Sequence, residues 1–166
     1  MSLRFVRIKN NQMGHSAEIK AIYGNKLRIR VCGILENHGN YLFVNHKKLN
    51  TENIFWNFPG GGVDDGESIS ETLVREFKEE VNLNVSIEQF CFFNEVIVDT
   101  LHAIELYFKV KSKNFDAKTG QDPELEIITD HKWMTIEQFS ELPTHQKPVV
   151  FSNLKSINDL INRFQN

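Results

Sequence analysis

Three glutamates crowd one predicted helix, and they constrain the chain more than any other feature of its sequence. At about 100° per residue, the spacing of Glu76, Glu79 and Glu80 places their side chains on one helix face. They lie near the helix C-terminus, where the helix dipole disfavours negative charge, and like charges one turn apart repel each other. A bound divalent cation offsets such repulsion, because hard cations such as Mg²⁺ require converging oxygen ligands.

The residues around the glutamates predict where this helix begins and ends. Ser68 and Glu71 have the Ser-x-x-Glu spacing of a capping box, and Asn82 suits the left-handed conformation that follows many helices. Glu80 falls at the margin of the apolar face, against the protein body, where an unpaired carboxylate is costly. Metal ligation is therefore favoured over a solvated acidic face. The apolar positions recur every four residues and are Ile69, Leu73, Phe77 and Val81.

Alternating and aromatic runs elsewhere predict strands separated by turn residues. A stop is expected at Pro59 to Gly62, a short helix begins at Thr135, and an amphipathic helix spans 151–164. Mixed strands flanked by helices predict an α/β fold of the α+β kind, an α/β/α sandwich with a mixed central sheet. The expected strands are 27–35, 41–44, 54–58, 85–98 with a break, 103–110 and 125–133.

Length and composition set the class of protein. The 166 residues favour a single domain over 1–166, with 1–26 as a poorly defined N-terminal segment. A net charge of −3 argues against a nucleic-acid partner. Cys32 and Cys91 lie in apolar runs and are expected to be buried free thiols. Neither a signal peptide nor a membrane-spanning apolar stretch is recognisable, so we expect a cytoplasmic protein without a membrane partner.

The glutamate helix is part of a longer spaced pattern. Gly61 is followed by Glu67, then by the run from Arg75 to Glu80, and then by Leu83. The sequence Phe-Pro-Gly-Gly-Gly leads into the pattern. This arrangement resembles the signature box of the Nudix hydrolases, with Asn82 in place of the usual glycine. Because Asn is the next-best residue for left-handed backbone, we expect this departure to have little effect.

The resemblance implies a hydrolase that uses Mg²⁺ or Mn²⁺ to cleave a diphosphate linkage in a nucleoside diphosphate derivative or a nucleoside triphosphate. This chemistry agrees with the carboxylates, because a diphosphate repels a water nucleophile and a divalent cation both neutralises charge and activates water. The expected metal ligands, which are also the catalytic carboxylates, are Glu76, Glu79 and Glu80. The resemblance adds the Gly60 carbonyl and, more weakly, Glu67.

Arg75 has two interpretations. The resemblance implies that it orients a box glutamate and so supports the catalytic group. The alternative is a surface ion pair with Glu71 or Glu79, each four residues away, which contributes little. We favour the orienting role.

Candidates outside the box have weaker support. In the resembled family a catalytic base or extra ligand often lies on a later loop, where Glu126 and Glu124 are best placed, with plain surface charge equally open. Arg28 and Arg30 share one strand face and are candidates for binding substrate phosphates, although solvent-facing charges are slightly favoured. Trp56 is a candidate for stacking on a base, while most of its aromatic run is expected in the core. The histidines show no ligand spacing.

Two classes of function remain in competition. The first is an enzyme acting on a small nucleotide-type substrate, and the second is a non-catalytic Nudix-type nucleotide-binding or sensor domain. A sensor is expected to lose box carboxylates, and this chain keeps them all. Residues 98–101 lack the proline or tyrosine found after the box in some subgroups, which disfavours typical ADP-ribose and dinucleoside polyphosphate hydrolases. The oligomeric state stays open, a homodimer included.

Overall fold

The computed structural model describes residues 17–120 and 128–165, and within these ranges seven strands form one mixed sheet. The path through the sheet is β3-β2-β1-β6-β5, with β4 paired to β1 and β7 paired to β2. The central pair, β1 and β6, is parallel, and the other pairs are antiparallel. The strands are β1 (Lys26–Asn37), β2 (Asn40–His46), β3 (Trp56–Asn57), β4 (Gly60–Gly62), β5 (Val85–Val98), β6 (Leu101–Ser112) and β7 (Ile128–Met134).

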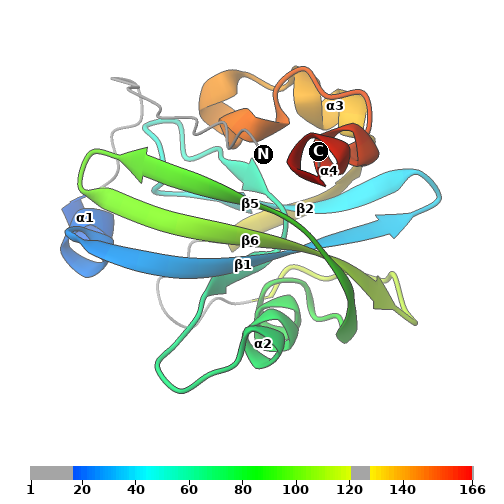
Figure 1. The fold of residues 1–166 in the computed structure, drawn as a ribbon, viewed down its shortest axis with the longest axis horizontal. Helices are drawn as coiled ribbons and strands as arrows, with labels where there is room; N and C mark the ends of the chain where they lie inside the picture. The colour runs from blue at the N-terminus through cyan, green and yellow to red at the C-terminus, as the bar shows by residue number, and fades with distance from the viewer. Residues whose placement is uncertain (1–16, 121–127, 166) are drawn as a thin grey trace.

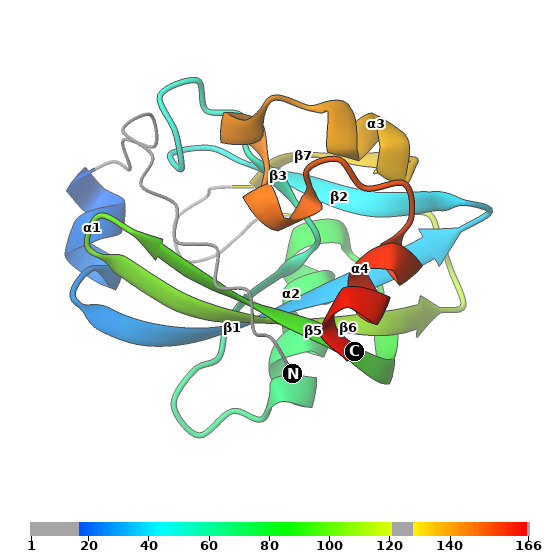
Figure 2. The same ribbon diagram turned by 45° about the horizontal axis from the view of Figure 1, so that its top comes forward.

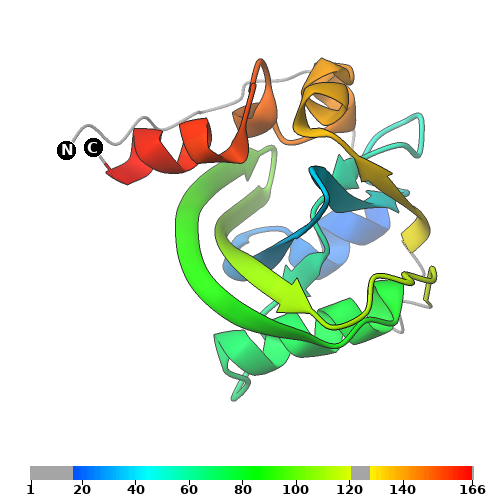
Figure 3. The same ribbon diagram turned by 90° about the vertical axis from the view of Figure 1, so that its right-hand side faces the viewer.

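Helices cover both faces of this sheet. Helix α2 lies on one face, and α3 and α4 lie on the other (Figure 1). The side view shows the sheet curling strongly between these two layers (Figure 3). The predicted α/β/α architecture with a mixed sheet is therefore confirmed. The helices are α1 (Ala17–Tyr23), α2 (Ile69–Val81), α3 (Ile136–Glu141) and α4 (Ile157–Gln165), with 3-10 turns at Thr144–Gln146 and Val149–Phe151.

Each interface between sheet and helices has its own core. Toward α3 and α4 the core is aromatic, with Phe43 stacked on Phe139 at a centroid distance of 3.9 Å. Toward α2 the core is mostly aliphatic, and Phe77 packs so closely on β1 that a Cβ at Gly33 would meet its ring at 2.3 Å. Cys32 and Cys91 are buried and free, as expected. Among the described residues, no helix has the length and apolarity needed to cross a bilayer.

Three strand predictions need correction. The break expected in 85–98 is absent, and β5 is one continuous strand. Its register with β6 shifts between Ile87 and Gln89 and again between Phe90 and Phe92. Such bulges bend a strand without ending it. The predicted strand 54–58 shortens to β3, because the chain then crosses from β2 to β1. The stop expected at the glycines is instead β4, which pairs with β1.

Helix limits also differ from the predictions outside α2. The C-terminal helix begins at Ile157 and not at 151, and a 3-10 turn precedes it. The N-terminal segment to 26 contains α1, which sequence patterning missed. On α2 itself, Ile69 does not join the core, since it is 36% exposed at the first turn. The predicted strand 125–133 corresponds to β7 from Ile128 onward, and residues 125–127 lie outside the described residues.

Candidate active site

Helix α2 is bounded as its sequence predicts. The Ser68 hydroxyl accepts from the Glu71 amide at its start, and the Glu71 carboxylate accepts from the Ser68 amide, which completes a capping box. At its end, Asn82 adopts the left-handed conformation with φ 54°, and its side chain accepts from Lys78 Nζ at 2.7 Å. Asparagine therefore fills the role of the usual glycine, and the departure from the box pattern leaves the helix end intact.

Strand β4 brings three glycines against the glutamate face of α2. The Gly60 amide donates to Glu80 Oε2 at 2.9 Å. Gly60 has φ 149°, and a Cβ there would lie 1.9 Å from the Val31 carbonyl oxygen. A Cβ on Gly61 would lie 2.1 Å from Glu76 Oε1. Gly60 and Gly61 are thus needed because the β1 backbone and the Glu76 carboxylate approach them too closely for a side chain.

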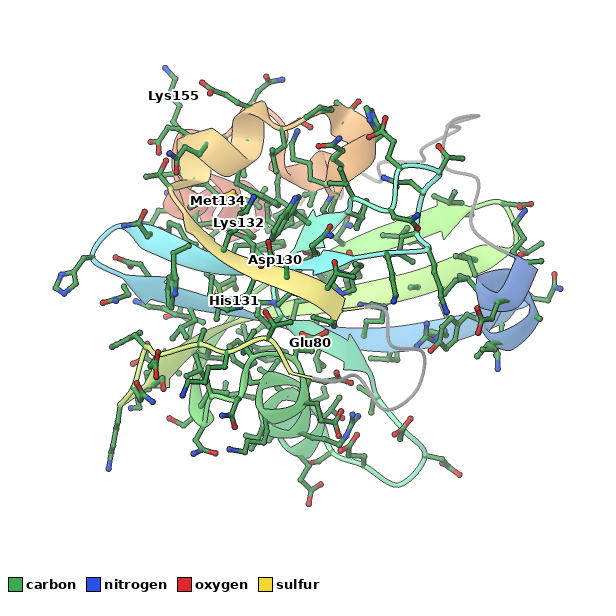
Figure 4. All side chains as sticks on the ribbon, turned by 180° about the vertical axis from the view of Figure 1, so that it is seen from behind. Glu80, Asp130, His131, Lys132, Met134 and Lys155 are labelled. Atoms are coloured by element: carbon green, nitrogen blue, oxygen red, sulfur yellow. The ribbon has the colours of Figure 1, made fainter. Side chains whose placement is uncertain are left out.

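The three box glutamates lie together, partly withdrawn from solvent. Glu80 is 4% exposed and lies between α2 and the strands (Figure 4), so its predicted position against the protein body is confirmed. The Glu76 and Glu79 side chains are 14% and 28% exposed. Burial, reinforced by the nearby Glu80 charge, raises the pKa of Glu76 to about 8. The cluster therefore holds more negative charge than its protein neighbours offset.

Arg75 organises the carboxylates around it. Its Nε and Nη2 each donate to the Glu67 carboxylate at 2.9 Å, and its Nη1 donates to Glu76 Oε1 and Glu79 Oε2 at 3.0 Å each. The guanidinium hydrogen bonds lower the pKa of Glu67 to about 2. Glu71 instead accepts from Ser68. Arg75 thus has the contacts of a residue that orients the box glutamates. One of these contacts, with Glu79, is also the ion pair that the alternative interpretation predicted.

The donor set fits a hard divalent cation in its chemistry, although the carboxylates do not form a finished cage. Among the residues that the structure describes, no three His, Cys, Asp or Glu side chains already form a metal-holding group. Arg75 donates to one oxygen of Glu76 and to one of Glu79. The raised pKa of buried Glu76 shows that additional positive charge would be favourable there. Glu76, Glu79 and Glu80 therefore remain the candidate ligands.

The two weaker ligand predictions fare differently. Both oxygens of Glu67 are used by Arg75, and one also accepts from Thr72 Oγ1 at 2.7 Å. Glu67 is therefore placed as a support for the guanidinium. The Gly60 carbonyl accepts from Arg30 Nη2 at a long 3.4 Å, which leaves this oxygen able to serve. Glu124 and Glu126 lie outside the described residues.

A cavity of about 140 Å³ adjoins the glutamates, walled by α1, β1, β5 and β6. Arg28 and Arg30 line both the cavity and the glutamate site, and neither is on a solvent-facing strand surface. The Arg28 guanidinium lies 3.6 Å from the centroid of the Tyr23 ring. Trp56 is not among the residues that line the cavity, because its ring is in the aromatic core beside Lys132.

Sequence reasoning missed His46, which lies between the cavity and the glutamates. It is 2% exposed, its Nε2 is 3.7 Å from Glu80 Oε1, and its Nδ1 is 3.3 Å from the Phe55 carbonyl oxygen. No spacing signal exists for this residue, because only the fold brings the end of β2 to α2.

Comparisons with known proteins show the family to which the chain belongs. Residues 25–153 match the model of the NUDIX domain. An RNA pyrophosphohydrolase of Pelagibacter ubique (strain HTCC1062) is 29% identical, covering 82% of this chain and 94% of its own. A nucleoside triphosphatase NudI of Escherichia coli O81 (strain ED1a) is 30% identical, covering 66% and 83%.

Solved structures show the same fold. The MutT protein from Methanosarcina mazei Go1 superposes with a TM-score of 0.66 at 20% identity, covering 85% of this chain and 94% of that one. A NUDIX hydrolase from Nitrosomonas europaea gives a TM-score of 0.60 at 20% identity, covering 82% and 87%. The chain therefore belongs to the NUDIX domain family, which confirms the resemblance seen in the pattern from Gly61 to Leu83.

Proposed function

We propose that this Nudix hydrolase is a metal-dependent pyrophosphohydrolase, which cleaves a diphosphate linkage in a nucleoside triphosphate or a nucleoside diphosphate derivative. The observation that carries the proposal is the convergence of Glu76, Glu79 and Glu80 beside a cavity, with two arginines that line both the glutamate site and the cavity. The relatives named as an RNA pyrophosphohydrolase and a nucleoside triphosphatase support this class of reaction.

Glu76, Glu79 and Glu80 would hold Mg²⁺ or Mn²⁺, with the Gly60 carbonyl as a further oxygen donor. When bound, the cation supplies charge neutralisation at the phosphoryl oxygens and a water of lowered pKa. Arg75 fixes the carboxylates of Glu76 and Glu79 by donating to one oxygen of each. Such outer hydrogen bonds set the orientation and basicity of ligating groups.

The remaining residues of the site bind substrate and handle protons. Arg28 and Arg30 would bind the substrate, because both line the glutamate site and the cavity. Glu126, with Glu124 as the alternative, stays our candidate for a base supplied by a later loop.

A substrate panel tests this proposal. The panel contains nucleoside triphosphates, nucleotide sugars, ADP-ribose, dinucleoside polyphosphates and an RNA with a 5′-triphosphate, each with and without Mg²⁺. We expect Mg²⁺-dependent turnover of at least one small nucleotide, and cleavage of the RNA in preference to all of these would contradict the small-molecule substrate class. Turnover of no compound, with the metal bound, would favour the sensor function.

Single carboxylate variants test the ligand assignment. Glu79→Gln and Glu80→Gln should lose most turnover and keep their fold, because each loses a charged ligand while its shape is preserved. Glu88→Gln is the matched control, since Glu88 is an exposed carboxylate on β5. A near wild-type rate for either box variant would refute the assignment.

Two further expectations accompany this function. We expect the protein in the cytoplasm, where nucleotides of this kind are available, and without a membrane partner. Chromatography with light scattering would decide whether it is a monomer or a homodimer.

A further inference from the structure

Three polar side chains form a row across the wall of the cavity. Arg30 on β1 lies directly opposite Glu105 on β6, and Glu105 lies directly opposite Asn94 on β5. Because directly opposed residues of neighbouring strands point to the same side of a sheet, all three face the cavity, which they line. The three strands run side by side in Figure 1. The other cavity residues from these strands are mainly apolar, for example Val96 and Ala103.

The row contains hydrogen-bonding groups that the protein leaves unmatched. Glu105 is only 7% exposed. Its Oε2 accepts from Asn94 Nδ2 at 3.1 Å and from Tyr107 Oη at 3.0 Å. Its Oε1 lies 3.8 Å from Arg30 Nε, beyond hydrogen-bond distance, and that buried Nε has no hydrogen-bond partner among the described residues. Buried polar groups are normally satisfied, so this gap points to a ligand that completes it.

The row offers a defined order of donors and acceptors. Arg30 Nε is a donor, and the Glu105 carboxylate is an acceptor. Asn94 uses its amide nitrogen on Glu105, so its Oδ1 is left as a second acceptor. A complementary ligand therefore presents an acceptor to Arg30, a donor to Glu105 and a second donor to Asn94. The sequence O6, N1–H and N2–H₂ on the edge of guanine has this order.

We propose that Arg30, Glu105 and Asn94 select a guanine base, so that the substrate of the proposed hydrolase is a guanine nucleotide. This inference rests on the proposed function for the reaction, but the row itself is a binding feature. The Tyr107 hydroxyl donates to Glu105 Oε2 and so helps to fix the carboxylate in place. The cavity is roughly ten times the space that one buried water needs, which suits a ring system.

The other bases match the row less well. Adenine offers N6–H₂ to Glu105 and N1 to Arg30, and it leaves the Asn94 acceptor without a donor. Uracil places its O2 against Asn94 Oδ1, where two acceptors repel. Cytosine has an unprotonated N3 at the middle position, where it would face the Glu105 carboxylate. Hypoxanthine equals guanine except for the missing amino group, so it isolates the contribution of Asn94.

Binding of nucleoside monophosphates in EDTA tests the row without turnover. Calorimetric titration of GMP, IMP and AMP into the wild-type protein should give the tightest binding for GMP. We expect at least a tenfold weaker affinity for AMP, since one well-placed pair of base contacts is worth about 1–3 kcal/mol, and an intermediate affinity for IMP. Equal affinities for GMP and AMP would overturn the proposal whatever the enzyme hydrolyses.

Variants then assign the preference to residues. Glu105→Gln turns the central acceptor into an amide and should abolish the preference for GMP over AMP, whereas Asn94→Ala should remove the difference between GMP and IMP. Glu88→Gln is the matched control on β5 and should keep both preferences. If Glu105→Gln does not fold, the wild-type comparison of GMP, IMP and AMP decides alone. A preserved GMP preference in folded Glu105→Gln would refute the assignment.

The failure of the inference and that of the proposed function are distinguishable. Equal kcat/KM for GTP, ITP and ATP with Mg²⁺, together with equal binding, would reject the guanine assignment and keep the hydrolase. Selective GMP binding with no turnover of any nucleotide would keep the guanine assignment and favour a sensor.

Discussion

The raised pKa of Glu76 makes the stability of the metal-free protein depend on pH. An unfolded glutamate has a pKa of about 4.5, and the folded site raises it to about 8 through burial and the charge of Glu80. Because the folded-state pKa is the higher one, this contribution to stability is fully present below about pH 4.5 and is lost as the pH rises through about 8. The stability contribution of Glu67 depends on pH in the opposite direction. Its folded-state pKa is lowered to about 2, so the contribution is present at neutral pH and is lost only as the pH falls toward 2.

The size of the effect follows from the shift. At about 1.4 kcal/mol per pKa unit, a rise from 4.5 to about 8 sets an upper limit of about 5 kcal/mol on the stability lost at high pH. Water entry and side-chain relaxation reduce such penalties, so we expect a fall of about 2 kcal/mol in the free energy of unfolding between about pH 5 and pH 8. A bound cation should suppress this fall, because ligating carboxylates are ionised already.

Urea unfolding at several pH values, in EDTA and in saturating Mg²⁺, measures these quantities. The difference between wild type and Glu76→Gln isolates the titration of Glu76, because histidines and other groups contribute to both proteins. In EDTA this difference should change with pH, and the stabilisation by Mg²⁺ should grow from about pH 5 to pH 8. Parallel pH profiles for wild type, Glu76→Gln and the control Glu88→Gln would refute the reasoning.

Two further variants test the geometry around the carboxylates. Arg75→Lys should lower kcat/KM by about 10–100-fold with Mg²⁺. A lysine cannot bind Glu67 bidentately while it also orients Glu76 and Glu79. An unchanged kcat/KM would show that Arg75 forms only a surface ion pair. Gly61→Ala should destabilise the fold by about 1–3 kcal/mol in urea and weaken Mg²⁺ binding, since its Cβ would displace Glu76, and wild-type values for both would contradict the close approach.

Local features of the site could be predicted from sequence because their causes lie within one helix. The capping box at Ser68, the left-handed Asn82 and the burial of Glu80 all follow from spacing along α2. Arg75 was also recognised, and its contacts with two box glutamates follow from neighbouring positions on the same helix.

Features that depend on strand pairing could not be predicted in the same way. His46 reaches Glu80 only because β2 ends beside α2. Glu105 and Asn94 look like ordinary strand residues until β6 and β5 pair in register, and two bulges in β5 shift that register. Trp56 shows the reverse case, since an aromatic residue that suited base stacking is placed in the core.

Steady-state hydrolysis by Glu80→Gln tests the central claim most directly. Diphosphate-bond cleavage should be measured with a nucleotide that the wild-type protein turns over, at saturating Mg²⁺ and in EDTA, with circular dichroism to confirm folding. The account predicts turnover by wild type and by Glu88→Gln only with Mg²⁺, and almost none by folded Glu80→Gln. Turnover by wild type in EDTA, or by Glu80→Gln at the wild-type rate, would contradict it.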